Sequence, residues 1–181
     1  MITHSLLRFS IILIFSLSSS LLLSCASHTI QQSAPLNPHS TWIFLPLLNH
    51  SDSPEAGERI ADIAATLLRS ERHINLLPTQ MPITDTQLPE LNTQKLVDQA
   101  IQWGKSQQYQ YGIGGSVQEW HYKSGLDGEP AVGITFTVVD LTTGSIVWSA
   151  TGAKTGWGRA SLSGTGQELI SELFAGLPLT E

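Results

Sequence analysis

The chain has 181 residues with 9 basic and 15 acidic side chains, which gives a formal net charge of −6 at pH 7. This balance disfavours nucleic-acid binding, because such binding favours a basic face. The single cysteine excludes an intrachain disulfide and a multi-cysteine zinc site.

The first 24 residues have the pattern of a secretion signal. Arg8 is followed by an apolar run, Phe9 to Leu23, which is shorter than the ~20 residues of a membrane-spanning helix. A short membrane anchor and a buried core helix are the alternatives. The ending Leu22-Leu-Ser-Cys25 favours a lipoprotein signal, whose peptidase needs an aliphatic residue, then a small residue before cysteine. We therefore predict a signal peptide over 1–24 and lipidation of Cys25.

The residues after Cys25 suggest where the protein lies. Ala26 stands where an aspartate commonly marks retention in the inner membrane, so we expect an outer-membrane anchor facing the periplasm. Residues 26–41 are rich in Ser, Gln, Pro and His and predict a flexible tether of about 20 Å. The remaining residues, 42–181, suit a single periplasmic domain.

Hydrophobic periodicity divides this domain into strands and helices. Strands are predicted at 42–48, 74–77, 111–122, 131–140 and 145–151, and helices at 53–70, 93–106 and 161–175. The order β-α-β-α-β-β-β-α predicts an α/β fold in which helices pack on a mixed sheet.

The connections and irregularities also follow from residue type. Pro46 lacks a backbone N–H and is expected at a strand end or bulge. Apolar parity slips between Val117 and Trp120, which predicts a bulge near Glu119. Residues 78–89 and the glycine-rich residues 152–158 are expected to form loops.

No residue pattern indicates catalysis. The mature domain lacks a cysteine nucleophile, and Gly112-Ile-Gly-Gly115 lies within a predicted strand with no helix opening after it, unlike a dinucleotide loop. The histidines have no ligand-pair spacing. We therefore predict a non-enzymatic protein without metal or cofactor.

Two features allow both a structural and a functional interpretation. Asp127 and Glu129 lie in the loop Ser124–Pro130, which is either an ordinary turn or an acidic binding surface. Trp157 lies between two loop glycines. It either contacts a membrane interface or a subunit, or folds back on the core.

Two runs of the sequence are unusual and specific: Gly-Leu-Asp-Gly-Glu-Pro at 125–130 and Ser-Ala-x-Gly-Ala-Lys-x-Gly-Trp at 149–157. With these runs, the chain resembles the PelC family, the outer-membrane lipoprotein of Pel exopolysaccharide export. The similarity covers nearly all of the predicted mature domain, including residues 42–50, 54–59, 115–123, 125–133 and 147–157.

The resemblance implies a dodecameric ring with an acidic funnel below or around the PelB porin, through which cationic Pel polysaccharide passes. Asp127 and Glu129 become the candidates for the acidic lining. Trp157 becomes the candidate for outer-membrane contact, with Arg159 and Lys154 pairing with lipid phosphates or a neighbouring subunit.

A lipoprotein that docks on and activates a peptidoglycan synthase is the alternative function. Such activators share a tethered plan and a similar α/β domain, but they carry a longer tether that crosses toward the cell wall. The segment 26–41 is short for that reach.

Overall fold

The computed structural model describes residues 26–31, 34–77, 93–125 and 128–180. Cys25, Asp127 and the predicted loop at 78–89 lie outside the described residues. No helix in the described part has the length and apolar character needed to cross a membrane.

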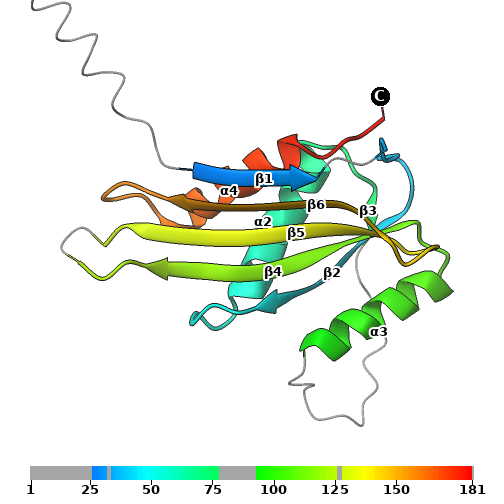
Figure 1. Ribbon diagram of the computed structural model, residues 1–181, viewed down its shortest axis with the longest axis horizontal. Coiled ribbons are helices and arrows are strands. Elements are labelled where there is room, and N and C mark those ends of the chain that lie inside the picture. The colour runs from blue at the N-terminus through cyan, green and yellow to red at the C-terminus, as the bar shows by residue number, and fades with distance from the viewer. Residues whose placement is uncertain (1–25, 32–33, 78–92, 126–127, 181) are drawn as a thin grey trace, which may run out of the picture.

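The domain is built on one six-stranded mixed sheet, with strand order β1-β6-β5-β4-β2-β3 (Figure 1). Strand β2 runs parallel to β3 and β4, whereas β4, β5 and β6 form an antiparallel meander and β1 lies antiparallel along β6. The predicted α/β fold with a mixed sheet is confirmed. The elements are β1 (Ala26–Gln31), β2 (Trp42–Asn49), α2 (Ala56–Ser70), β3 (Leu76–Leu77), α3 (Thr93–Ser106), β4 (Tyr111–Tyr122), β5 (Pro130–Asp140), β6 (Ile146–Thr155) and α4 (Leu162–Ala175).

Helices α2 and α4 cover one face of the sheet and enclose the main core. Alternate residues of a strand point to the same face, so β5 sends Phe136 inward, where its ring lies 4.8 Å from that of Phe174 on α4. Trp148 of β6 is also buried, and its indole N–H donates to the Gly176 carbonyl at 3.1 Å. This bond satisfies the polar atom of a large core side chain.

Helix α3 covers only part of the opposite face, beside β2. A small second core forms there from Ile43, Leu45, Ala100 and Leu141. Over β4, β5, β6 and β1, none of the described helices covers this face (Figure 1). The domain therefore has three layers, with helices on both faces of the sheet, beside β2, and two layers elsewhere.

Both predicted strand irregularities are confirmed. The β2–β4 register shifts between Phe44 and Leu47, around Pro46. The β4–β5 register shifts between Val117 and Glu119. Each shift lets the strand keep its apolar residues on the core side after the irregular residue.

Two loop predictions are wrong. The predicted flexible tether contains β1, which pairs residue by residue with β6 from Ala26↔Lys154 to Gln31↔Ser149. The predicted loop at 152–158 begins only after Thr155, because residues 152–155 of β6 pair with residues 131–134 of β5, and β1 pairs along the other edge of β6 as far as Lys154. Gly152 serves close packing, since a Cβ there would lie 3.0 Å from Leu169 of α4.

Helix α2 also begins later than predicted. Ser53 to Glu55 form a turn, and the helix starts at Ala56. Glu55 has a left-handed backbone conformation (φ 60°), which breaks the helix before it.

The close contact between α4 and β4 is testable with Gly166→Ala. A Cβ at Gly166 would lie 2.5 Å from Cζ3 of the buried Trp120. An unhindered helical Gly→Ala change stabilises by about 0.5–1 kcal/mol. The clash should reverse this sign and lower the unfolding free energy by about 1–3 kcal/mol in chemical denaturation.

Ser163→Ala, at an exposed position of the same helix, is the control and should change stability by less than about 0.5 kcal/mol. A Gly166→Ala protein more stable than wild type would contradict the packing described.

Candidate functional site

Four strand termini meet at one end of the sheet, which we call the anchor end (Figure 1). The first residue of β1, Ala26, pairs with Lys154 near the end of β6, and Tyr122, the last residue of β4, pairs with Pro130. Cys25 directly precedes Ala26, and consecutive Cα atoms are about 3.8 Å apart. The predicted lipidation residue is thereby tied to the anchor end by chain connectivity.

Trp157 also lies at the anchor end, in the loop between β6 and α4. Its side chain is 73% exposed, so the interpretation that it folds back on the core is wrong. The Gly156 N–H donates to the Pro130 carbonyl at 2.9 Å, and the Ala160 N–H donates to the Trp157 carbonyl at 2.8 Å. These bonds hold the loop against the domain and leave the indole in solvent.

Gly156 is required for this loop conformation. A Cβ at Gly156 would lie 2.6 Å from both Pro130 Cγ and Thr165 Oγ1, a distance at which atoms must move. Arg159 follows in the same loop and is exposed. The structure therefore brings Trp157 and Arg159 together on the surface of the anchor end.

Tyr122 is a further exposed aromatic residue at the anchor end that sequence reasoning missed. Its side chain is 53% exposed, and its hydroxyl accepts a hydrogen bond from the Leu162 N–H at 3.0 Å. Its position as the last residue of a predicted strand was the sequence feature that could have indicated an exposed ring at this end of the sheet. Tyrosine and tryptophan share a preference for membrane–water interfaces.

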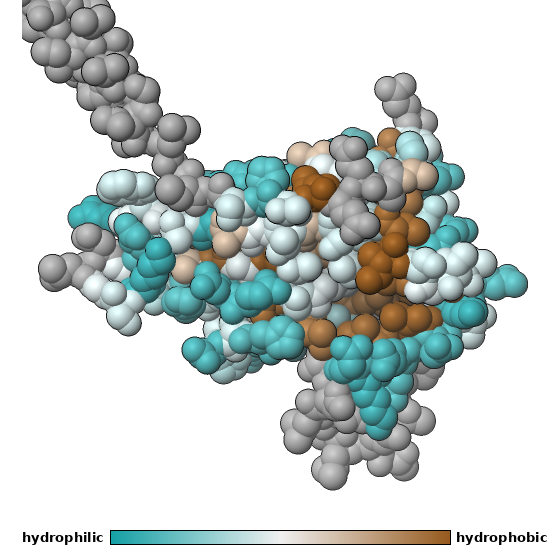
Figure 2. Space-filling model, in the orientation of Figure 1, coloured by the Kyte–Doolittle hydropathy of each residue, from teal (hydrophilic) through white to brown (hydrophobic). Residues whose placement is uncertain are grey.

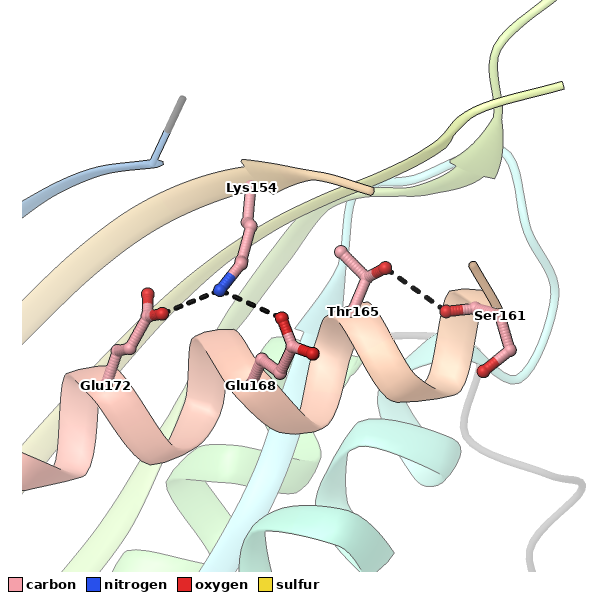
Figure 3. Close-up of polar contacts among 5 residues, drawn as sticks. All are labelled: Lys154, Ser161, Thr165, Glu168 and Glu172. Carbon is pink, nitrogen blue, oxygen red and sulfur yellow. Dashed lines mark hydrogen bonds and ion pairs between the residues drawn. The ribbon is translucent and has the colours of Figure 1, made fainter. Parts of the chain in front are cut away.

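Lys154 points inward, so its predicted pairing with lipid phosphates or a neighbouring subunit is wrong. It has the same parity on β6 as the buried Ala150, so its side chain turns toward α4 and is only 10% exposed. Its ammonium lies 3.0 Å from Glu168 Oε2 and 2.6 Å from Glu172 Oε1 (Figure 3). Both partners are on the covering helix of its own chain.

The two glutamates also determine the protonation of Lys154. Burial lowers the pKa of the ammonium, but hydrogen bonds and Coulomb attraction from Glu172 and Glu168 outweigh burial, so the pKa lies above its ordinary value. The cluster thus keeps a full positive charge beneath β6, where it joins the sheet to α4. Ser161 caps the N-terminus of helix α4, because its hydroxyl accepts a hydrogen bond from the Gly164 N–H at 3.0 Å.

Glu129 lies in the connection between β4 and β5 and is partly neutralised. Its carboxylate is 3.9 Å from the Lys123 ammonium, and its carbonyl accepts from the Lys123 N–H at 2.8 Å. An exposed pair of this kind contributes about 0–1 kcal/mol. Within the described residues, no group of acidic, histidine or cysteine side chains could hold a metal ion.

In the cluster of Lys154, Glu168 and Glu172, removing the cation and removing the two carboxylates should have unequal effects on stability. Lys154→Met leaves two hydrated glutamates and should lower the unfolding free energy by about 1 kcal/mol. The double change Glu168→Ala/Glu172→Ala leaves a buried cation without those partners and should cost about 2–3 kcal/mol. Denaturant unfolding measures both. A larger loss for Lys154→Met would contradict the assigned burial.

The raised pKa of Lys154 gives the cluster a defined pH dependence. A folded-state pKa above the unfolded value means that the stabilisation is complete at lower pH and is lost as pH rises through the folded-state pKa. The stability difference between wild type and Lys154→Met should therefore stay constant from about pH 7 to about pH 9. It should shrink only above pH 10.5; a loss that begins near neutrality would disprove the ion pairs.

Comparison with solved structures relates this fold to PelC. A point variant of the PelC dodecamer from Paraburkholderia phytofirmans has a TM-score of 0.72 and 31% identity, over 86% of this chain and 100% of that chain. A second PelC dodecamer from that organism has a TM-score of 0.72 and 30% identity, over 87% of this chain and 100% of that chain.

Lipoprotein GNA1162 from Neisseria meningitidis shares the fold alone, with a TM-score of 0.53 and 16% identity over 75% of this chain and 96% of that chain. Neither the family models nor the curated proteins match the sequence. The agreement with the two PelC structures extends over the complete domain at 30% identity or more. The chain belongs to the PelC family.

Proposed function

We propose that this protein is a lipoprotein anchored in the outer membrane that forms an acidic periplasmic ring and guides cationic Pel polysaccharide to a PelB-type porin. A PelC-like role and self-association are supported by the two similar dodecamers. The observation that carries the membrane part is the anchor end, where the residue after Cys25 and the exposed Trp157 lie together.

The anchor end has the chemistry of a surface that rests on lipid headgroups. Stable attachment by acyl chains takes two hydrophobic signals, and the exposed rings of Trp157 and Tyr122 supply contacts in addition to a lipidated Cys25. Arg159 is exposed beside Trp157 and suits a lipid phosphate. Because β1 begins at Ala26, the domain is held close to the membrane.

The polymer-guiding part of the proposal rests on charge. The acidic chain attracts a cationic polymer, and each exposed ion pair is worth only about 0–1 kcal/mol. Weak contacts let a polymer slide, and a ring repeats them in every subunit. Asp127 is the stronger candidate for the lining, because Glu129 is already paired with Lys123.

The alternative, activation of a peptidoglycan synthase, fits the anchor end less well. An activator must reach from the outer membrane toward the cell wall. Here the chain enters the sheet at Ala26 and remains near the domain at Leu36, which is buried and donates its N–H to the Pro178 carbonyl at 2.7 Å. Little chain is left to extend.

The non-enzymatic nature of the protein is likewise part of our proposal.

Trp157→Ala tests membrane contact at the anchor end. In a full chain carrying Cys25→Ser, which removes the lipid, the change should weaken binding to vesicles of outer-membrane lipids by about threefold to tenfold, because an interfacial indole is lost. Ile146→Ala is the matched control. Ile146 is also exposed (63%) but begins β6 at the opposite end of the sheet. Equal losses in both variants would contradict the assigned orientation.

Asp127→Asn tests polymer guidance. Secreted Pel should fall while the sedimentation mass of the delipidated protein remains that of a ring. Glu129→Gln should have a smaller effect, because Lys123 already offsets its charge. A monomeric mass at high protein concentration would contradict the ring. Unchanged secretion in Asp127→Asn would remove this residue from the lining.

A further inference from the structure

A row of four hydroxyl side chains crosses the part of the sheet that no described helix covers. Ser116 of β4 is in register with Thr135 of β5, Thr135 with Thr151 of β6, and Thr151 with Thr29 of β1. Adjacent strands are about 4.8 Å apart, so the hydroxyls are evenly spaced across four strands. We call these residues the hydroxyl row.

Three members of the hydroxyl row, Ser116, Thr135 and Thr151, are linked by hydrogen bonds. Thr135 Oγ1 and Thr151 Oγ1 are 2.8 Å apart. The amide Nε2 of Gln118 donates to Ser116 Oγ at 2.8 Å and to Thr135 Oγ1 at 3.2 Å. These bonds position the side chains at the surface, and each hydroxyl keeps further capacity to donate or accept.

The face around the row is hollow, and its described lining lacks lysine and arginine but includes His28. A hollow of about 390 Å³ lies over β1, β6, β5 and β4 and is lined by residues that include Gln118, Glu119, Thr135 and Thr151. This volume lies within the range of about 300–1,000 Å³ usual for ligand pockets. No Lys or Arg lines it, and Glu119 supplies its carboxylate. Figure 2 shows this side of the molecule white to teal over the strands, with the brown apolar surface gathered toward α3.

The composition of this face is unusual for a contact between subunits. The cores of protein–protein interfaces are enriched in aromatic residues, Met and Arg, and depleted in Ser and Ala. The described lining holds Ser, Thr, Gly and Ala together with His28, Gln118 and Glu119, and it has no Phe, Tyr, Trp, Met or Arg. The exposed Trp157 and Ile146 lie at or beyond the two ends of β6. This face is therefore suited to a polar, hydroxylated occupant.

We infer that the hydroxyl row and Glu119 form a contact surface for a glycan chain that carries amino groups. The serine and threonine hydroxyls exchange hydrogen bonds with sugar hydroxyls, and the exposed Glu119 carboxylate attracts a free amine. The described lining has no Phe, Tyr or Trp ring on which a sugar could stack, which keeps each contact weak. This inference rests on the proposed function and adds to it a second polymer-contacting surface, separate from the loop at 124–130.

The test uses the full lipidated chain in detergent and two probes of equal length, a chitosan oligosaccharide and its fully N-acetylated form, with affinity measured by calorimetry. Thr135→Val/Thr151→Val keeps side-chain shape and should weaken binding of both probes by about threefold to tenfold. Glu119→Gln should weaken only the cationic probe. Thr142→Val, in the exposed β5–β6 turn, and Glu58→Gln, exposed on α2, are the controls and should leave both affinities unchanged.

The outcomes separate this surface from the proposed function. If the row variants bind both probes normally while Asp127→Asn reduces secretion, the inference is wrong and the guiding role stands. If the row variants change the sedimentation mass instead of glycan affinity, the face is a contact between copies and the inference is again wrong. If wild type assembles as a ring but binds neither probe and Asp127→Asn secretes normally, the guiding role fails as well.

Discussion

The pairing of β1 with β6 is the constraint on which the functional geometry depends. It extends the sheet beyond the antiparallel meander and brings the chain that follows Cys25 beside the end of β6 that leads into the loop of Trp157. Without this pairing, the anchor and the aromatic surface would be connected only through a flexible segment. With it, the chain that follows Cys25 and the aromatic surface occupy one end of a single sheet.

Most of the domain was predictable because its elements bury apolar residues with a clear period. The order of strands and helices from Trp42 to Ala175 is confirmed, as are the irregularities at Pro46 and before Glu119. Strand β1 was missed because it is a polar edge strand whose stability comes from β6, more than a hundred residues away in the chain. The sequence of the segment itself therefore does not indicate which strand it pairs with.

The candidate site was predictable in part, and for physical reasons. Trp157 is distinctive because flanking glycines leave an indole without neighbours to bury it, and the structure exposes it. Lys154 was misjudged because the strand was predicted to end at Thr151. Once β6 continues, alternation directs Lys154 toward α4 and its two glutamates. Asp127 lies outside the described residues, so its role stays a prediction.

The direction of the β1–β6 hydrogen bonds also has a mechanical consequence. Bonds between antiparallel strands run perpendicular to the strand axis, and the predicted lipidation residue, Cys25, immediately precedes the first residue of β1. A pull applied to the chain before Ala26 along this axis loads the bonds of the strand pair in shear, together, instead of opening them one after another. A subunit built in this way resists a pull on its first strand, and the resistance comes from six residues, four of them polar, with Ile30 packed against the main core.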